Sequence, residues 1–438
     1  MDGYNLISFV GIFVLMGVAW VFSADRRNMN WRLMAWGVGL QLLAALFIFV
    51  VPAGARVFLV VNDVVVKVLE SAGKGAYFVF GRLALGPGQT SEDGVESIGF
   101  ILAFQAFPTI IFFSALLAIL YYLGIMPRLI KAFAWLFTRL MRVSGAESLA
   151  TASNIFVGVE SNLTIKPYLA RLTASELCTV LTAGMATVAS NVLALYVLTL
   201  QGQFPTIAGH LVSASLLSAP AALIMSKILL PERGTPETLG VHVEPYYEPD
   251  SSLFEAIING ANAGVRMIAG IVALLIAVLG LVALVDLGLS SIGDVLNPLL
   301  GTKGSWSLGG LFGYLFYPLT LVLGVPLDDV REVSRIIGER LIVTEVAAYG
   351  DLAAAMKEGL LHHPRSAVIT TYALCGFTHV ASMAIFVGSV CALAPQCTKT
   401  IGPVAVRALV AATLACLMTA CIAGTFFSEG SILLGGPK

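Results

Sequence analysis

The chain has 438 residues, of which 58% are hydrophobic and only 12% charged, and its mean hydropathy is +0.90. Soluble domains carry about 25% charged residues, so this composition excludes an ordinary soluble globule and indicates a polytopic membrane protein. The formal net charge is -1 and no dense run of lysine or arginine occurs, which argues against a nucleic-acid partner.

Eight stretches are apolar enough and long enough to cross a membrane, since a spanning helix needs about 20 residues. They are 5–23, 33–51, 98–126, 177–200, 207–230, 265–287, 367–390 and 404–426. Arg26, Arg27 and Arg32 follow the first stretch, so the positive-inside rule places this loop in the cytoplasm. We therefore expect an inner (plasma) membrane protein with both termini outside.

Other segments are too polar or too irregular to be ordinary spans. Residues 56–80 predict an amphipathic helix that does not span and lies at the interface or against other helices, and 127–142 predict a cytoplasmic interfacial helix. A short helix is expected at 253–263, and a partly regular interfacial segment at 298–325. Residues 231–252 predict a cytoplasmic loop to which no function is assigned.

The stretch SNIFVGVESNLTIKPYL, residues 153–169, places Glu160 and Lys166 inside membrane-grade sequence. A carboxylate at the bilayer centre costs about 2.5–3.5 kcal/mol, so Glu160 is expected in a protein-enclosed cavity or in an ion pair. Gly158 and Pro167 weaken a continuous helix, which predicts a re-entrant hairpin. Residues 328–361 predict a second hairpin, with Glu345 in the apolar patch IVTEVAAY.

A short internal repeat follows the two hairpins. Residues 184–192 read GMATVASNV and residues 376–384 read GFTHVASMA, so both contain G-x-x-x-V-A-S. The predicted topology starts the two copies from opposite sides of the membrane, which is typical of the inverted repeats of secondary transporters. The alternative is a simple preference for small residues at helix contacts.

The polar residues of these segments also have structural explanations. Glu160 and Glu345 could pair with Lys166 and Arg340, but intramembrane acids at helix breaks favour ligand contact. His379 could be a core histidine that donates to a backbone carbonyl, although Ser382 lies one helical turn further on. Asn154 and Thr187 suit either helix contacts or Na⁺, whereas Asp328, Asp329, Arg331, Glu332 and Arg335 look like a solvated helix face.

Cysteine usage and catalytic motifs give no sign of an enzyme. The six cysteines lie mostly in apolar runs without metal-ligand spacing, and we interpret them as packing residues. An intramembrane enzyme using Glu160, Glu345 and His379 is the rival hypothesis, but the chain has no nucleophile elbow and no HExxH motif. A passive channel is a third possibility.

Several sequence blocks resemble those of the concentrative nucleoside transporter family and occur in the family's order. They are ASNIFVG, a glutamate followed by KPYL, GMATVASNVLALYV, IGERLIVTEVAAY and ALCGFTHVASMAI. The resemblance covers over half the chain, from residue 152 to the last helix. It implies a homotrimer whose protomers each have a scaffold domain and a transport domain with two hairpins and two unwound helices. In the family the first hairpin and first unwound helix contact the nucleobase, and the second pair holds the ribose.

The resemblance also assigns residues. Glu345 matches the family glutamate that bonds ribose hydroxyls, and Phe377 and Ser382 match its partners. Four positions match the sodium site, two through side-chain oxygens and two through backbone carbonyls: Asn154, Val157, Thr187 and Val188. The expected substrate-binding set is Glu160, Ser161, Asn162, Val192, Glu345, Phe377, His379 and Ser382.

The chain departs from the family in the first hairpin, at His379 and at residues 344–346, where Thr-Glu-Val replaces Asn-Glu-Phe. Its first hairpin has Gly-Val-Glu-Ser-Asn at 158–162 where the family has Gly-Gln-Thr-Glu-Ala-Pro, so the expected base contacts from glutamine and threonine are missing. His379 stands where the family has asparagine, and a histidine there could bind the ligand or titrate near neutral pH.

These observations predict an all-α membrane protein of about eight spans, two re-entrant hairpins and interfacial helices. Scaffold helices are expected at 1–144, and scaffold and connecting helices at 201–327. The transport domain is expected at 145–200 and 328–394, and the last span and tail at 395–438. The expected function is ion-coupled symport of nucleosides or related ribosylated compounds by an elevator-like mechanism, driven by Na⁺ or alternatively H⁺, with no other cofactor. An H⁺-coupled transporter of a different polar metabolite is the alternative.

Overall fold

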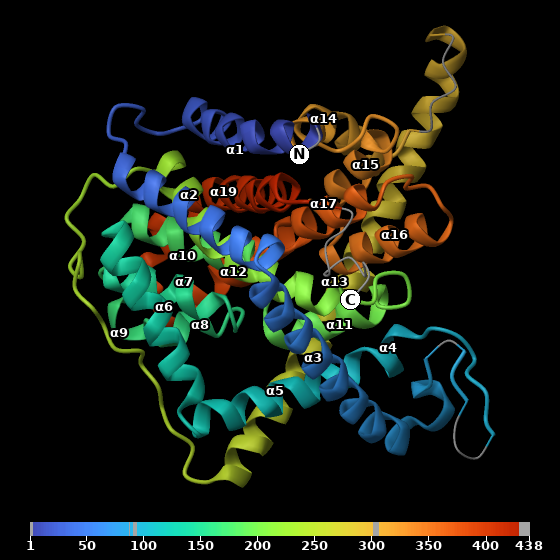
Figure 1. Cartoon of the computed structure of the whole chain (residues 1–438), viewed down its shortest axis with the longest axis horizontal. Coiled ribbons are helices and arrows are strands. Elements are labelled where there is room, and N and C mark those ends of the chain that lie inside the picture. The colour runs from blue at the N-terminus through green and yellow to red at the C-terminus, as the bar shows by residue number, and fades with distance from the viewer. Residues whose placement is uncertain (1–2, 87, 91–93, 301–305, 429–438) are drawn as a thin grey trace.

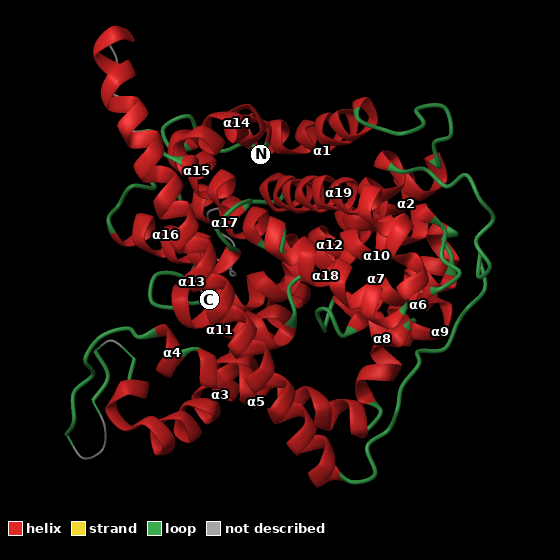
Figure 2. Cartoon of the chain, turned by 180° about the vertical axis from the view of Figure 1, so that it is seen from behind, coloured by secondary structure: helices red, strands yellow, loops and turns green. Residues whose placement is uncertain are grey.

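The computed structural model describes residues 3–86, 88–90, 94–300 and 306–428, and within these ranges the chain is helical and contains no strand. In chain order the α-helices are α1 (Gly3–Val21), α2 (Trp31–Ala45), α3 (Pro52–Phe80), α4 (Leu102–Gln105), α5 (Phe107–Tyr122), α6 (Ile125–Met141), α7 (Gly145–Asn154), α8 (Ser161–Thr164), α9 (Lys166–Leu169), α10 (Ala174–Ala186), α11 (Ser190–Leu200), α12 (Ile207–Leu229), α13 (Leu253–Leu300), α14 (Leu308–Val322), α15 (Val330–Arg340), α16 (Glu345–Lys357), α17 (Pro364–Leu374), α18 (Val380–Leu393) and α19 (Thr398–Thr425). Figure 2 shows loops between most of these helices, and three short helices also lie in the connections: the π-helix Leu46–Val50 and the 3-10 helices Gly81–Ala84 and Pro395–Cys397. The all-α prediction is confirmed.

Seven helical stretches in the described part of the chain are long and apolar enough to cross a membrane. They are Gly3–Val21, Trp31–Val50, Leu102–Tyr122, Ala174–Leu200, Ile207–Leu229, Leu253–Pro298 and Pro395–Thr425. Each overlaps one predicted span. The eighth prediction, 367–390, falls on α17 and α18, which are separated by five non-helical residues and are each too short to span alone.

Two local predictions were wrong in detail. The short helix at 253–263 and the following span are one helix, α13, because no proline interrupts them. The segment at 298–325, expected to be only partly regular, contains the regular helix α14. The helix predicted at 56–80 is present as α3, which starts at Pro52 and packs against α12, where Gly209 approaches the Phe58 carbonyl so closely that a Cβ would lie 2.9 Å from it.

The core contains two sets of elements in the same order. In the first set, a hairpin of α7 with α8 and α9 (hairpin 1) precedes the broken helix α10–α11 and then α12. In the second set, a hairpin of α15 and α16 (hairpin 2) precedes the broken helix α17–α18 and then α19. The sets interlock, because α12 and α10 both contact α19 while α12 also contacts α17. Figure 1 shows α10, α12, α17 and α19 in the middle, with α1 and α14 above them and α3 and α5 below.

The helix breaks of the two sets meet inside this core. Gly376, in the second break, has φ +142°, a conformation that favours glycine, and a Cβ there would lie 2.8 Å from the Met185 carbonyl oxygen at the end of α10. Hairpin 1 reaches the same region, since Ser190 N–H donates to the Phe156 carbonyl at 3.0 Å. The unwound backbone is thus enclosed in protein, as it must be at membrane depth.

Buried polar contacts close the base of hairpin 1. Ser144 and Glu147 form a capping box at the start of α7, and Thr173 and Glu176 form another at the start of α10. Lys227, near the end of α12, lies 2.8 Å from the Glu147 carboxylate, and both side chains are buried. The capping residues therefore tie the hairpin to its neighbouring helices.

Asp329 holds the base of hairpin 2, which corrects its assignment to a solvated face. Its carboxylate is fully buried and accepts hydrogen bonds from Ser366 and from the backbone of His362 and His363. Burial raises the pKa of Asp329, but these hydrogen bonds outweigh burial and hold that pKa below its ordinary value. The carboxylate links the start of hairpin 2 to the segment that follows it.

Candidate functional site

A cavity of about 120 Å³ lies between the two hairpins, the two broken helices and α13. It is lined by Gly158, Val159, Glu160, Ala189, Val192, Met267, Ile271, Leu274, Leu275, Thr344, Glu345, Val346, Phe377, His379, Ser382, Ile385 and Phe386. Most of the wall is apolar, with two carboxylates, one imidazole and two hydroxyls. A mainly apolar cavity with a few convergent polar groups is typical of a small-molecule site.

Glu345 is the most constrained polar group of this cavity. It is the first residue of α16, directly after the N-cap Thr344, and it is 4% exposed. Tyr196 on α11 donates a hydrogen bond of 2.8 Å to Oε1, while Oε2 has no well-aligned hydrogen bond in the described part of the chain. One carboxylate oxygen is therefore fixed by Tyr196, and the other, beside His379, has a lone pair left for a ligand.

His379 lies next to Glu345 at the start of α18. Its Nδ1 accepts a hydrogen bond from the Ser382 backbone N–H at 3.2 Å, and the Ser382 hydroxyl oxygen accepts one from the His379 backbone N–H. Nε2 lies 2.8 Å from Glu345 Oε2. Because Nδ1 acts as an acceptor, the proton of the neutral imidazole is on Nε2, facing the carboxylate.

Glu160 lines the same cavity from the non-helical tip of hairpin 1. Its Oε2 is buried and has no hydrogen-bond partner in the described part of the chain. Lys166 instead lies 3.7 Å from Glu248, and Arg340 donates to the Ala373 carbonyl, so neither structural ion pair considered for the two glutamates is formed. Each of the two cavity-lining carboxylates therefore has one buried oxygen without a well-aligned hydrogen bond in the described part of the chain.

The structure brings most of the expected substrate-binding residues together. Glu160, Val192, Glu345, Phe377, His379 and Ser382 line the cavity. Ser161 and Asn162 lie outside its lining, because the Ser161 hydroxyl donates to Asn154 and the Asn162 amide donates to Ser389. The shortened hairpin thus contributes Gly158, Val159 and Glu160 to the wall.

The four residues expected to bind sodium lie at neighbouring breaks. Asn154 and Val157 are at and just after the end of α7, and Thr187 and Val188 follow the end of α10. Gly158 is packed so close to Ala189 that an added Cβ would lie 3.1 Å from its methyl group, which places the two breaks together. Helix C-terminal ends and free carbonyl oxygens favour a cation.

The residue that positions Glu345 and the apolar wall from α13 were among the features that the sequence did not predict. Tyr196 is four residues after Val192 on α11, so helical spacing places the two on one face and could have identified it. Met267, Ile271, Leu274 and Leu275 come from α13, and no sequence signal distinguishes these apolar residues from the lipid-facing ones around them.

Family models match the chain in three segments. The Na⁺ dependent nucleoside transporter N-terminus matches residues 10–83, a nucleoside recognition Gate model matches 103–203, and the Na⁺ dependent nucleoside transporter C-terminus matches 210–424. Nucleoside permease NupC of Helicobacter pylori is 33% identical over 425 residues, which is 96% of this chain and 98% of the permease. The chain belongs to the concentrative nucleoside transporter family.

Other members of the family give the same assignment. Mouse solute carrier family 28 member 3 is 36% identical over 96% of this chain, but the match is 58% of its own length, so the chain spans about three-fifths of this curated relative. Two structures of CNTnw, one inward-facing with substrate bound and one outward-facing, superpose with TM-scores of 0.84 and 0.86 at 31% identity. Each match covers 97% of this chain and 98% of CNTnw.

Membership of a transporter family confirms the prediction that the chain is not an enzyme. The six cysteines are free, and no group of three or more histidine, cysteine, aspartate or glutamate side chains is placed to hold a metal ion in the part of the chain that is described.

Proposed function

We propose that the protein is a secondary active symporter that imports nucleosides or closely related ribosylated compounds. The observation that carries the proposal is the Glu345 carboxylate, which Tyr196 holds through one oxygen while the other faces an enclosed cavity beside His379. A carboxylate oxygen accepts hydrogen bonds from ribose hydroxyls, and such charge-assisted bonds are the strong ones.

The two walls of the cavity are assigned different parts of the ligand. Ribose hydroxyls are placed against Glu345, His379 and Ser382, with Phe377 packing on the sugar. The base lies toward Glu160 and Val192. Glu160 Oε2 accepts from a base N–H, in place of the glutamine and threonine that the family usually has in this hairpin. Ser161 and Asn162 act indirectly, by holding the hairpin tip through Asn154 and Ser389.

Movement of the wall is part of the mechanism. The cavity of about 120 Å³ is smaller than the roughly 300–1,000 Å³ of typical ligand pockets. The apolar wall from α13 must therefore separate from the hairpins to admit a nucleoside. We assign residues 145–200 and 328–394 to a transport domain that moves against a scaffold of residues 1–144 and 201–327, with 395–438 as the last helix and tail, in an elevator-like cycle.

The coupling ion is assigned to the neighbouring helix breaks. Na⁺ binds the side-chain oxygens of Asn154 and Thr187 and the carbonyls of Val157 and Val188, and orders hairpin 1 before substrate enters. Ser161 already donates to Asn154 Oδ1, and the Thr187 hydroxyl donates to the Ala183 carbonyl, so both oxygens retain lone pairs. The alternative ion is H⁺, carried by His379 beside Glu345.

The assembly is proposed from the family and the surface together. Three copies form a homotrimer in the inner (plasma) membrane, with both termini outside. Helix α13 exposes a row of large apolar side chains to lipid or to neighbouring copies, including Ile276, Leu281, Leu284 and Leu287.

Uptake into proteoliposomes tests the function. Radiolabelled uridine and adenosine are supplied with an imposed Na⁺ or H⁺ gradient, and accumulation against the substrate gradient is expected with one of the ions. Glu345→Gln is expected to weaken uptake about 10- to 100-fold, since a hydrogen bond to a charged group contributes about 1.5–3 kcal/mol. Glu358→Gln, at the exposed end of α16, is the matched control. Uptake that only equilibrates indicates a channel, and no ion-dependent uptake of either nucleoside contradicts the proposal.

A further inference from the structure

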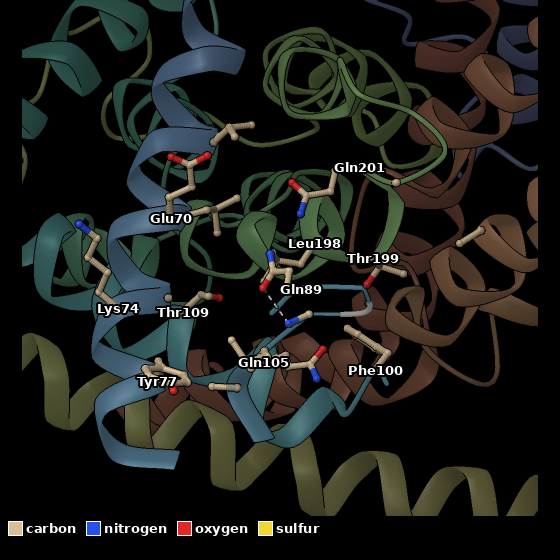
Figure 3. Close-up of a pocket in the computed structure, with 18 of the residues that line it drawn as sticks. Glu70, Lys74, Tyr77, Gln89, Phe100, Gln105, Thr109, Leu198, Thr199 and Gln201 are labelled. Carbon is tan, nitrogen blue, oxygen red and sulfur yellow. Dashed lines mark hydrogen bonds between the residues drawn. The ribbon is translucent and has the colours of Figure 1, made fainter. Parts of the chain in front are cut away.

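A second, larger cavity of about 1040 Å³ lies beyond the first. Figure 3 shows its walls, which come from α3, the segment leading into α5, the C-terminal end of α11 and the middle of α16. On the expected topology α11 ends outside the cell, so this cavity opens on the external side. None of the residues expected to bind substrate or sodium lines it.

Gln105 is the group in this cavity that indicates a ligand. It is 8% exposed, and its Nε2 donates to the Leu83 carbonyl at 3.3 Å and to the Gly99 carbonyl at 2.6 Å. Both partners are acceptors, so they determine which end of the carboxamide is the nitrogen. Oε1 is left buried without a hydrogen bond in the described part of the chain, and Figure 3 shows the side chain between Tyr77 and Phe100. An unpaired buried acceptor favours binding of a donor.

The remaining lining defines the chemistry of such a ligand. Glu70 and Lys74 contribute one charge of each sign, and Gln201 and Thr199 add uncharged donors and acceptors from α11. The lining residues that the structure describes therefore carry no net charge to attract an anion or a cation. Tyr77 adds an aromatic face next to Gln105. This set suits a neutral molecule with several N–H or O–H groups and a planar ring.

The two cavities lie in series along the same helices. On α16, Val346 lines the inner cavity and Gly350 and Ala353 line the outer one, four and seven residues further on, which is about 6–10 Å along the axis. On α11, Val192 lines the inner cavity and Thr199 the outer one, at the same seven-residue spacing.

An apolar cluster separates them. Phe107 and Ile110 on α5 pack with Leu275 on α13, and Val346 packs against this cluster. Leu275 and Val346 line the inner cavity, while Gln105 and Thr109, next to the other two, line the outer one. A ligand moving between the cavities therefore has to displace this cluster.

We propose that the outer cavity is a second nucleoside-binding site, an external vestibule in which Gln105 Oε1 accepts a hydrogen bond from the ligand before it passes the apolar cluster. This proposal rests on the proposed function, because it takes the ligand class from it. The vestibule binds more weakly than the inner site, since none of its charged groups is buried beside the ligand as Glu345 is.

Equilibrium binding of radiolabelled uridine and adenosine to the purified protein tests the vestibule. The unmodified chain is expected to bind two equivalents of nucleoside at saturation, and Glu345→Gln is expected to weaken the tighter equivalent about 10- to 100-fold and to leave the weaker one unchanged. Gly350→Leu fills the outer cavity, because no atom lies within 4 Å of a Cβ built there, and is expected to remove the weaker equivalent. Gly388→Leu, at an equally open helical glycine away from both cavities, is the control and keeps both equivalents. Ala353→Leu repeats the test on the same face of α16, should Gly350→Leu fail to fold.

The outcomes separate the two proposals. A single equivalent that Glu345→Gln weakens and Gly350→Leu leaves intact overturns the vestibule and leaves the proposed function standing. A single equivalent that Glu345→Gln leaves unchanged and Gly350→Leu removes supports the vestibule and contradicts the assignment of the inner site. A chain that binds neither nucleoside contradicts both.

Discussion

Replacing His379 separates two contacts that one imidazole makes. Nδ1 caps α18 by accepting from the Ser382 N–H, and Nε2 lies 2.8 Å from Glu345 Oε2. Asparagine is a good N-cap but is too short to reach Glu345 as well, whereas alanine makes neither contact. His379→Asn therefore removes the contact with the carboxylate alone, and His379→Ala removes both contacts.

The expected losses of stability follow from these contacts. An interaction with a charged partner contributes about 1.5–3 kcal/mol, and an N-cap about 1 kcal/mol. We expect the free energy of unfolding to fall by about 1.5–3 kcal/mol in His379→Asn and by about 2.5–4 kcal/mol in His379→Ala. Denaturant titration in detergent micelles measures both values. Equal losses in the two variants refute the cap, and an unchanged His379→Asn refutes the contribution of the Glu345 contact.

The same variant discriminates between the coupling ions. Nδ1 can gain a proton only if its bond to the Ser382 N–H breaks, so protonation is linked to the start of α18. If H⁺ drives transport through His379, His379→Asn loses uptake driven by a pH gradient. With Na⁺ as the coupling ion, Na⁺-driven uptake persists in His379→Asn and its pH dependence is unchanged.

Three further predictions concern the breaks and the hairpin bases. Gly376→Ala is expected to destabilise the protein by about 1–3 kcal/mol or more, because its φ is positive and its Cβ would lie 2.8 Å from the Met185 carbonyl oxygen. Gly388→Ala, in open helical surroundings, is the control and is expected to be neutral or stabilising. Thermal unfolding compares the two variants, and equal midpoints contradict the reasoning. Lys227→Met leaves the buried Glu147 carboxylate unpaired and is expected to lower the free energy of unfolding by about 3–5 kcal/mol, measured as a lower unfolding midpoint. A loss below about 1 kcal/mol would mean that the pair contributes little to stability. The pKa of Asp329 is held below its ordinary value, so its carboxylate stabilises the folded state above about pH 4, and this stabilisation is lost as pH falls through the lowered folded-state pKa. The difference in unfolding free energy between the natural protein and Asp329→Asn should therefore shrink below about pH 4, and a difference that does not change there contradicts the assignment.

Much of the architecture could be predicted from composition and pattern. Long apolar runs require spanning helices, because unpaired backbone groups cannot face lipid. Glu160 and Glu345 marked the hairpins for the same energetic reason, since a carboxylate is too costly in hydrocarbon. The shared G-x-x-x-V-A-S motif located both breaks, and in the second it contains the glycine, Gly376, that the positive φ requires.

Only the tertiary structure decided which polar groups meet. Asp329 looked solvated beside its charged neighbours, yet it is buried by residues 33–37 positions further along the chain. Glu345 is paired with Tyr196 and His379 rather than with the nearby Arg340, and α13 closes the cavity with apolar residues that resemble its lipid-facing ones. The cost of burying a polar group depends on its own chemistry and is visible in the sequence, whereas the partner that offsets this cost is brought close by packing between distant segments.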